Sequence, residues 1–361
     1  MRTGHDAARP GPGATTRRLR PGLRVLDLAE HGVQLGCDPR WAVRLPGLTE
    51  AERAGLRALV PGSPVPAAAP GVPADRWDQL LDELTSAGVL VPGRPHRPPL
   101  NVGAVDAVAW SLLEPDGDGR PRIERRQQAA VGVLGLGPTG LMLAGALATC
   151  GVGALRLEDP TPVRSVDVGP GGYRWSDVGA ARQDVAARLL RDVAPHLRSS
   201  PAQDDPEVIV VVEGEVADPV RATTLLAYGL PHLSVLVREA EVQVGPLVVP
   251  GDGPCLRCLD LHRTDADPAW PALLHRLAAA PANRPGELHV PVLAGVAAHL
   301  AAAMVLGLLD GEPRRPGLTW QVPLPDAVPR ERVWAPHPRC GCGDDPAQWL
   351  FARTEQPDRP G

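Results

Sequence analysis

The chain has 361 residues, of which 43% are hydrophobic and 22% are charged, and its formal net charge is −5. This length allows for two or three domains of about 100 to 200 residues each. The negative charge gives no electrostatic reason to expect binding to bulk nucleic acid or to an anionic membrane, so neither is expected as a partner. The 43 prolines and 39 glycines indicate sizeable connectors between the folded parts.

The first 20 residues are expected to form a disordered cytoplasmic tail. Five arginines stand there among Gly, Pro and Thr, and no apolar run follows that could serve as the core of a secretory signal: Arg2, Arg9, Arg17, Arg18 and Arg20. Four of the six cysteines form two close pairs, which is typical of metal ligation in a reducing compartment. The sequence therefore predicts a cytoplasmic protein.

Residues 21–95 are predicted to form a small winged-helix-like α+β domain. Short apolar runs separated by turns between residues 22 and 45 are typical of a hairpin sheet. Thr49 and Glu52 form a capping-box pattern, because the hydroxyl and the carboxylate can satisfy free N–H groups at a helix start. Apolar residues at helical spacing over 77–84 indicate a second helix, which the strand-like run 89–91 follows.

Residues 96–124 are expected to be a linker and lead-in, and residues 125–345 a larger α/β domain of the Rossmann type. Strand-like runs alternate there with helical ones, as in a mostly parallel sheet covered by helices. The strands are expected at 131–135, 153–158, 207–212 and 233–237, and the helices near 139–150, 178–191 and 219–228. Residues 346–361 are expected to form a C-terminal tail.

The run 290–309 is long and apolar enough to be considered as a membrane span. We expect it instead to be a buried helix of the α/β domain. Pro291 fits a helix start, Asp310 and Gly311 fit a helix end, and His299 interrupts the middle of the run.

A glycine fingerprint stands between the first strand and the first helix of the larger domain. In VGVLGLGPTG, Gly135, Gly137 and Gly140 fit a tight turn, a close approach of the backbone to phosphate, and close packing of the helix on the strand. Asp159 ends the next strand-like run, where a carboxylate commonly binds a ribose hydroxyl. The pattern predicts a nucleotide-binding-type fold, although the glycines could also serve packing alone.

The paired cysteines predict a structural zinc site. Cys255 and Cys258 form one short-spaced pair and Cys340 and Cys342 another, and two such pairs complete a tetrahedron of thiolates. Four protein ligands leave no position open for water or substrate. Two histidines lie near enough in sequence to replace a ligand: His262 and His337. The remaining cysteines, Cys37 and Cys150, fit packing as small apolar residues.

The glycine fingerprint, Asp159 and GPCLRC, in this order, resemble the ThiF and ubiquitin-activating superfamily over about residues 125–345. More narrowly, GVGALRLEDP, SDVGAARQDVA, GPCLRCLDLHRTDADPAWP and HPRCGCG resemble the ThiF-like partner proteins of azoline-forming cyclodehydratases, which belong to ribosomal peptide natural-product pathways. In that family a winged-helix peptide-recognition element precedes the ThiF-like domain. This is the order expected for the present chain.

The resemblance implies that the recognition element captures the leader of a precursor peptide as an added strand, delivers it to a YcaO-type cyclodehydratase, and belongs to a homodimer. Main-chain hydrogen bonds would give affinity, and pockets between the sheet and the helix over 74–87 would select side chains. DNA binding, the other use of a winged helix, is disfavoured because acidic residues outnumber Arg76 on that helix and would repel phosphate: Asp75, Asp78, Asp82 and Glu83.

Active members of the superfamily adenylate a carboxylate with ATP and Mg²⁺, and the charged residues for this reaction look eroded here. Arg182 stands where the family has Lys. Asp167 occupies the neighbourhood of the family's Asn-x-x-Arg-Gln, and the basic residue considered in its place is Arg174 in GGYRW. The usual Asp-x-x-Asp reads Val-Glu-Gly-Glu, which leaves Glu213 and Glu215 as imperfect metal ligands. Each of these residues also has an ordinary interpretation as a surface charge.

We therefore expect a non-catalytic binding and docking protein. The alternative is an ATP-dependent adenylyltransferase that acts on a peptide or sulfur-carrier carboxylate, with Arg174 and Arg182 in catalysis and the glycines, Asp159 and Arg182 at the nucleotide. A NAD-dependent oxidoreductase would share the glycine loop, but it would not explain the cysteine pairs.

Overall fold

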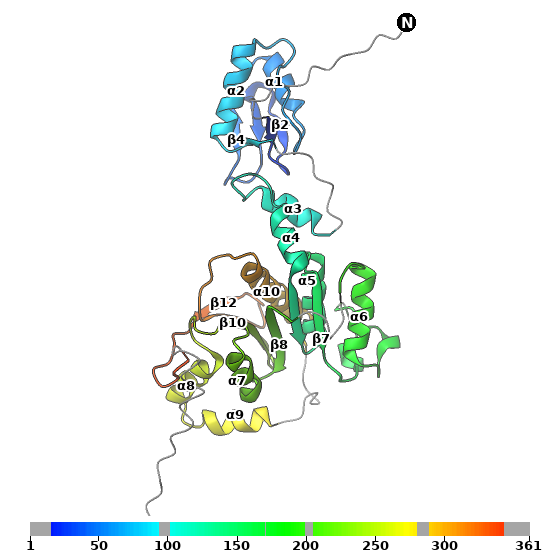
Figure 1. Cartoon of the computed structure of the whole chain (residues 1–361), viewed down its shortest axis with the longest axis vertical. Coiled ribbons are helices and arrows are strands. Elements are labelled where there is room, and N and C mark those ends of the chain that lie inside the picture. The colour runs from blue at the N-terminus through cyan, green and yellow to red at the C-terminus, as the bar shows by residue number, and fades with distance from the viewer. Residues whose placement is uncertain (1–15, 94–101, 170, 199–204, 280–288, 343–361) are drawn as a thin grey trace, which may run out of the picture. The chain divides into compact units, whose positions relative to one another are not determined.

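The structure is a computed structural model of the chain and describes residues 16–93, 102–169, 171–198, 205–279 and 289–342. The chain divides into two compact units, Met1–Ile123 and Glu124–Gly361, coloured blue to cyan and cyan-green to red in Figure 1. The expected start of the larger domain at residue 125 lies beside this division. The expected tail at 346–361 lies outside the described residues.

The first unit is a small α+β domain built on short strands. Its elements are β1 (Arg17–Leu19), β2 (Val25–Asp27), the 3₁₀ helix η1 (Ala29–His31), β3 (Val33–Leu35), β4 (Val43–Leu45), α1 (Glu50–Arg57), α2 (Ala74–Ser86), β5 (Leu90–Pro92) and α3 (Ala104–Ser111). Strands β2, β3 and β4 form an antiparallel sheet in that order, and β1 pairs with β5. The expected hairpin sheet, two helices and closing strand are all present.

Apolar residues from the sheet and from both helices form one core in this unit. Leu35, Leu56 and Trp77 are buried together, and the Trp77 indole lies close to Gly55 of α1. The capping box is confirmed, because the Thr49 hydroxyl accepts from the Glu52 N–H at 3.3 Å and the Glu52 carboxylate accepts from the Thr49 N–H at 2.6 Å. This cap fixes where α1 begins.

Two expectations for this unit are corrected. Residues 1–20 were expected to be a tail, but Arg17–Leu19 is strand β1 and the Leu19 side chain is fully buried; residues 1–15 lie outside the described residues. The expected linker 96–124 contains helix α3, and Arg20 holds the segment after this helix by donating to the carbonyls of Ser111 and Glu114 at 2.8 and 2.6 Å. A buried guanidinium with carbonyl partners makes this arginine structural.

The second unit contains a seven-stranded sheet in the order β12-β11-β10-β9-β8-β6-β7. Its strands are β6 (Ala130–Leu134), β7 (Ala154–Glu158), β8 (Val208–Gly214), β9 (His232–Val237), β10 (Glu241–Val248), β11 (Leu318–Pro323) and β12 (Arg330–Val333). Its helices are α4 (Arg120–Gln128, which spans the division), α5 (Pro138–Thr149), η2 (Ser165–Asp167), η3 (Trp175–Asp177), α6 (Arg182–Val193), α7 (Pro219–Ala227), α8 (Leu256–Ala266), α9 (Trp270–Ala278) and α10 (Pro291–Leu309).

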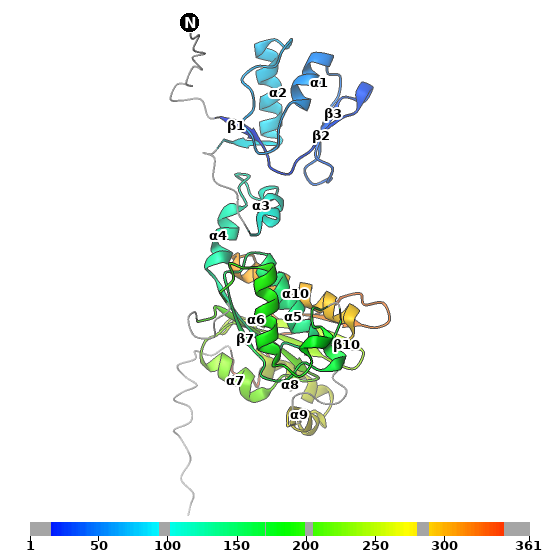
Figure 2. The same cartoon turned by 90° about the vertical axis from the view of Figure 1, so that its right-hand side faces the viewer.

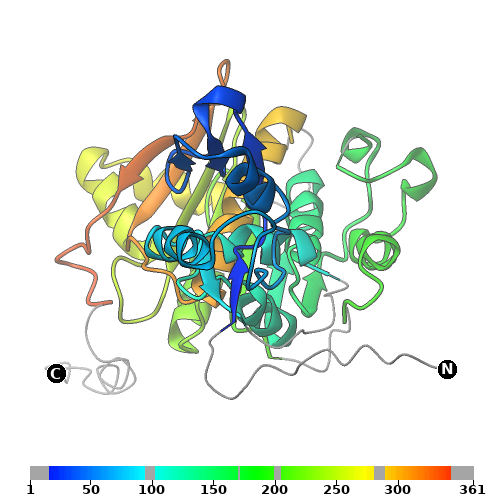
Figure 3. The same cartoon turned by 90° about the horizontal axis from the view of Figure 1, so that it is seen from above.

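Strands β9, β8, β6 and β7 are parallel neighbours, as expected from the alternation of strands and helices. Strands β10, β11 and β12 extend this sheet in antiparallel pairing and were not expected. In Figure 3 the yellow-green to orange antiparallel strands lie on the side of the sheet away from the green helix α6. The fold is thus a Rossmann-type α/β domain with an antiparallel extension.

The two faces of this sheet carry different helices. Val131 and Val210 pack into the large core with α5, α6 and α10, whereas Ile209 and Val211 pack with Leu225 of α7 on the other face, because side chains alternate along a strand. Figure 2 shows α5, α6 and α10 on one side and α7 and α8 on the other.

Helix α10 is the expected buried helix. Among the described residues it is long and apolar enough to cross a membrane by length and composition. In the fold it lines the large core with Leu293, Ala297, Ala301 and Val305. Its packing against α5 and the sheet explains the apolar sequence.

Candidate functional site

The glycine loop joins β6 to α5, and packing alone requires two of its glycines. Gly135 has a φ of +86°, and a Cβ there would lie 2.2 Å from the Val212 carbonyl oxygen. A Cβ at Gly140 would lie 1.9 Å from the Gly135 carbonyl oxygen. Both contacts are with backbone and cannot be relieved by moving a side chain. The packing interpretation of the glycines therefore holds for Gly135 and Gly140.

Gly137 is different, because a side chain lies against it. A Cβ at Gly137 would lie 2.5 Å from Nε2 of His289. The His289 ring is held by a hydrogen bond of 2.8 Å between its Nδ1 and the Thr139 hydroxyl, at the start of α5. Sequence reasoning missed His289, since its distance of 150 residues from Thr139 gives no local signal.

Asp159 lies at the end of β7 as expected, but protein groups occupy its carboxylate. One oxygen accepts from the Leu136 N–H at 2.8 Å and from Arg182 at 3.3 Å. The other accepts from the N–H of Thr161 at 3.1 Å and from its hydroxyl. A carboxylate has about four lone-pair sites, so these donors use its capacity. With 7% of its surface exposed, Asp159 has no acceptor left for a ribose hydroxyl.

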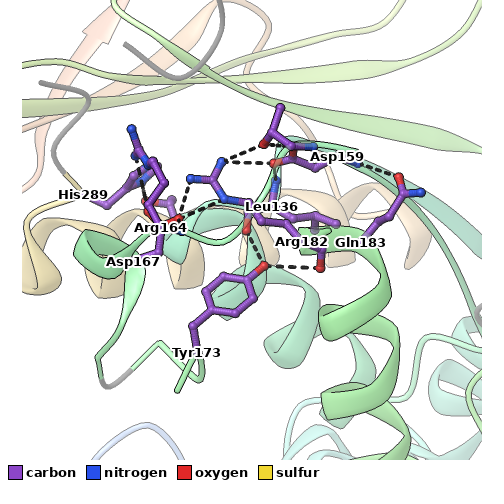
Figure 4. A network of polar contacts seen from close by, with 10 residues as sticks. Leu136, Asp159, Arg164, Asp167, Tyr173, Arg182, Gln183 and His289 are labelled. Carbon is purple, nitrogen blue, oxygen red and sulfur yellow. Dashed lines mark hydrogen bonds and ion pairs between the residues drawn. The ribbon is translucent and has the colours of Figure 1, made fainter. Parts of the chain in front are cut away.

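Arg182 and Asp167 complete a buried ionic network beside the glycine loop (Figure 4). The Arg182 guanidinium donates to one Asp167 oxygen at 2.6 and 3.1 Å. Burial opposes the charges, but the Arg164 N–H and Arg182 outweigh it and lower the pKa of Asp167. Burial also disfavours the charged form of Arg182, but the hydrogen bond and the charge of Asp167 outweigh this effect and raise the pKa of Arg182. Arg182, proposed from sequence as a nucleotide contact, is an internal counter-ion.

Tyr173 fastens the segment after β7 to the glycine loop. Its hydroxyl donates to the Leu136 carbonyl at 2.6 Å, and burial raises its pKa. Leu136 is thereby bonded on both backbone groups, since its N–H donates to Asp159. Sequence reasoning did not single out Tyr173, although one of two tyrosines in the chain standing after two glycines was a usable signal.

The other charged candidates do not converge on this network. Arg174 is exposed, and its backbone N–H donates to Asp177. Glu213 forms an ion pair with Arg221, and burial raises its pKa. Glu215 has a φ of +59° at the end of β8. Among the described residues, the group that could hold a metal ion consists of cysteines alone, so these carboxylates form no such cluster.

The four predicted cysteine ligands come together from α8 and from the segment after β12. The sulfurs of Cys255, Cys258, Cys340 and Cys342 all lie within 4.8 Å of one another and are buried. Two pairs are closer, with 3.5 Å between Cys255 and Cys340 and 3.2 Å between Cys258 and Cys342. A tetrahedral zinc with bonds of about 2.3 Å would separate its sulfurs by about 3.8 Å. The donor set therefore fits one metal ion.

The two histidines beside this cluster are not additional ligands. His337 is buried, with Nε2 2.8 Å from Asp265 and Nδ1 accepting from the Arg339 N–H at 3.1 Å. Nε2 of His262 lies 3.0 Å from the Ala335 carbonyl. Both rings thus hydrogen-bond to the segment that leads to the second cysteine pair.

In the first unit, β4 offers a free sheet edge. Hydrogen bonds from Gly36 to Arg24 and from Leu28 to Gly32 set the phase of the β2–β3 pair, so the backbone groups of Gln34 point to β2. Gln34 is opposite Arg44 in the β3–β4 pair. Because backbone groups alternate sides along an antiparallel strand, Arg44 directs its N–H and C=O to the outer edge. Among the described residues, β4 pairs with β3 alone.

At the opposite edge of this sheet, β2 is joined to α1 by side-chain ion pairs. Asp27 of β2 pairs with Arg53 and Arg57 of α1. On α2, Arg76 pairs with Glu52, so the one arginine of that helix is engaged within the unit. These arginines are therefore paired with carboxylates of the same unit, whereas the backbone groups of Arg44 point outward from β4.

The sequence matches the ThiF family over residues 107–342. Curated proteins give no match. Similar solved structures include E. coli MccB with MccA-N7isoASN (16% identity, 91% of this chain and 100% of that chain, TM-score 0.65) and E. coli MccB with ATP (17%, 91% and 99%, 0.62). PaaA is also similar (18%, 87% and 98%, 0.62). At these identities the structures show the shared fold. Because the family match covers more than half of the chain, this protein belongs to the ThiF family.

Proposed function

We propose that this chain binds the leader of a ribosomally made precursor peptide through its first unit and docks it to a YcaO-type cyclodehydratase. That enzyme would then form thiazolines or oxazolines in the peptide. The ThiF-like unit serves as a scaffold without catalysis of its own. The proposal rests on the free edge of β4 in a winged-helix-like unit joined to a ThiF-family unit.

The edge of β4 supports binding of an extended peptide. Arg44 offers an outward N–H and C=O, and a peptide that pairs with them would extend the sheet by a strand. Val43 and Leu45, which flank Arg44, are half-buried and pack against the core of the unit. A structurally similar protein supports the proposal, because the Microcin C7 biosynthetic enzyme MccB has been solved in complex with N-formylated MccA.

The occupied charges beside the glycine loop support a scaffold role. Asp159 and Arg182, which an adenylating site would turn toward a nucleotide and its magnesium, satisfy each other and Asp167. The residues present therefore do not fit ATP. The four cysteines fit zinc, which would hold the segment after β12 against α8 and has no open coordination position for chemistry.

The decisive test for peptide binding uses two substitutions at one position. Arg44→Pro removes the outward N–H of β4, whereas Arg44→Ala keeps it and removes the side chain. With a fluorescently labelled leader of a candidate precursor peptide that the wild-type chain binds, we expect polarisation measurements to show binding about tenfold or more weaker for Arg44→Pro. Arg44→Ala should bind within about threefold of the wild-type chain. Equal binding by all three proteins would refute pairing at this edge.

Docking is tested by co-purification from the native host. Recovery of a cyclodehydratase together with a short peptide would support the proposal, and recovery of neither would contradict it. We also infer a cytoplasmic location and a homodimer. Light scattering of the purified chain measures the second of these directly.

The alternative is an ATP-dependent adenylyltransferase, which the similarity to E. coli MccB solved with ATP favours. This function requires the ion pairs around Asp159 to rearrange. ATP–pyrophosphate exchange by the wild-type chain that disappears in Asp159→Ala would establish it and would overturn the scaffold role.

A further inference from the structure

His289 fills the space that Gly137 leaves open in the glycine loop. A Cβ at Gly137 would lie 2.5 Å from Nε2 and 2.8 Å from Cε1 of this ring. Gly137 has φ −57° and ψ 177°, which any residue can adopt, so backbone conformation does not require glycine here. Neither does a backbone neighbour. In this structure the His289 imidazole fills the space that the absence of a side chain at Gly137 leaves.

In Rossmann-type folds the second glycine of the loop has another use. It lets the backbone approach a pyrophosphate, which then lies against the N–H groups at the start of the following helix. In this chain Gly137 is the N-cap of α5, and Thr139 stands in the first turn. The hydrogen bond between Thr139 and His289 places the ring at the start of this helix. The ring and a phosphate would compete for one space.

We propose that His289 is the residue that excludes phosphate from the glycine loop, so that a nucleotide can enter only when the imidazole leaves. This inference rests on the proposed scaffold role of the second unit and gives that role a specific physical cause. The imidazole fills the space beside Gly137 that a phosphate would need. Thr139 holds the ring there with a hydrogen bond of 2.8 Å.

The size of the effect follows from the population of the open state. If only a fraction of molecules has the ring withdrawn, the apparent dissociation constant rises by the inverse of that fraction. A ring that is withdrawn in about one molecule in a hundred would weaken phosphate binding about a hundredfold. Removing the ring should restore this factor, apart from any cost of reshaping the loop.

The experiment measures binding of two probes to the full-length chain by calorimetry. The probes are ATP with magnesium and inorganic pyrophosphate, and the second is included because it needs no ribose acceptor and so does not depend on Asp159. We expect His289→Ala to bind at least one probe about tenfold or more tightly than the wild-type chain. His299→Ala, which removes an exposed histidine of α10, is the matched control and should match the wild-type chain.

Two further variants locate the binding and guard against misfolding. Gly137→Ala added to His289→Ala places a methyl group where the ring was and should abolish the gained binding. Thr139→Ala leaves the ring in place but removes its hydrogen bond, and should strengthen binding about fivefold, as expected for a net hydrogen bond of about 1 kcal/mol. This variant decides the question if His289→Ala does not fold.

The outcomes separate the two proposals. If the wild-type chain binds neither probe and the His289 and Thr139 variants bind neither, the exclusion by His289 is wrong while the scaffold role stands. If the wild-type chain itself binds ATP as tightly as His289→Ala, the exclusion is wrong and the scaffold role loses its support. Tighter binding in His289→Ala that Gly137→Ala reverses supports the inference.

Discussion

Replacing Arg182 by Met tests whether the ionic network beside the glycine loop is an internal structure. The guanidinium lies between Asp159 and Asp167, which are 7% and 2% exposed. Met is apolar and unbranched but shorter than Arg, and it leaves both carboxylates without Arg182, although Arg164 still lies 3.3 Å from Asp167. Breaking such a buried pair costs about 3 to 5 kcal/mol. At about 2 to 4 °C per kcal/mol for a unit of this size, the thermal midpoint should fall by about 6 to 20 °C.

The loss should depend on pH with a definite sign. The pKa of Asp167 is lowered in the folded chain, so its contribution is fully present above the ordinary value of about 3.9 and is lost as the pH falls through the folded value. Urea unfolding of both proteins should therefore differ most near neutral pH and converge in acid. Arg182→Lys should lose less, because the charge remains although the planar fork does not.

Arg330→Met is the matched control for this prediction, because Arg330 belongs to the same unit and pairs with Asp326 at the surface. Exposed pairs contribute about 0 to 1 kcal/mol. If Arg182→Met lost no more stability than Arg330→Met, or if its loss did not shrink in acid, the network would not be the internal counter-charge described here.

Three other predictions concern the remaining buried contacts. Elemental analysis should find one zinc ion per chain that Cys258→Ser loses, together with a lower thermal midpoint; unchanged zinc would contradict the site. Asp310→Ala removes the carboxylate that pairs with the buried Arg126, and urea unfolding should show a loss of about 3 to 5 kcal/mol in the free energy of unfolding. Asp326→Ala, at an exposed pair, should lose under about 1 kcal/mol. Thr49→Ala removes the cap of α1 and should cost about 1 kcal/mol in the same assay; no change would show the cap to be dispensable.

Local sequence patterns predicted the elements whose signals are contiguous. Thr49 and Glu52 marked the start of α1, and the alternation of apolar runs gave the four parallel strands of the second unit. The antiparallel strands were missed for physical reasons. β10 contains Gly245 and Pro246, which read as a turn, and β12 is an exposed edge rich in charge. Their pairing comes from the sheet to which they add.

The same division holds for the candidate site. The three glycines, Asp159 and the four cysteines were found because each motif is short and ordered along the chain. The contacts that these motif residues make in the fold could not be predicted from the motifs. Asp159 is saturated by Thr161, Leu136 and Arg182, and His289 reaches the loop from far along the sequence. Strand Arg17–Leu19 was missed because its two arginines made the segment look like part of a charged tail, although Leu19 is buried.

The spacing of the metal site has a consequence for biosynthesis. Its first two cysteines and its last two are separated by about 85 residues, and α9, α10, β11 and β12 lie between them. During synthesis from the N-terminus the parallel strands emerge first, and the second half of the ligand set leaves the ribosome only after β12. A chain released early would hold the glycine loop but no complete metal site. Binding of a metal ion by all four cysteines therefore requires that the antiparallel strands β10, β11 and β12 have already been synthesised.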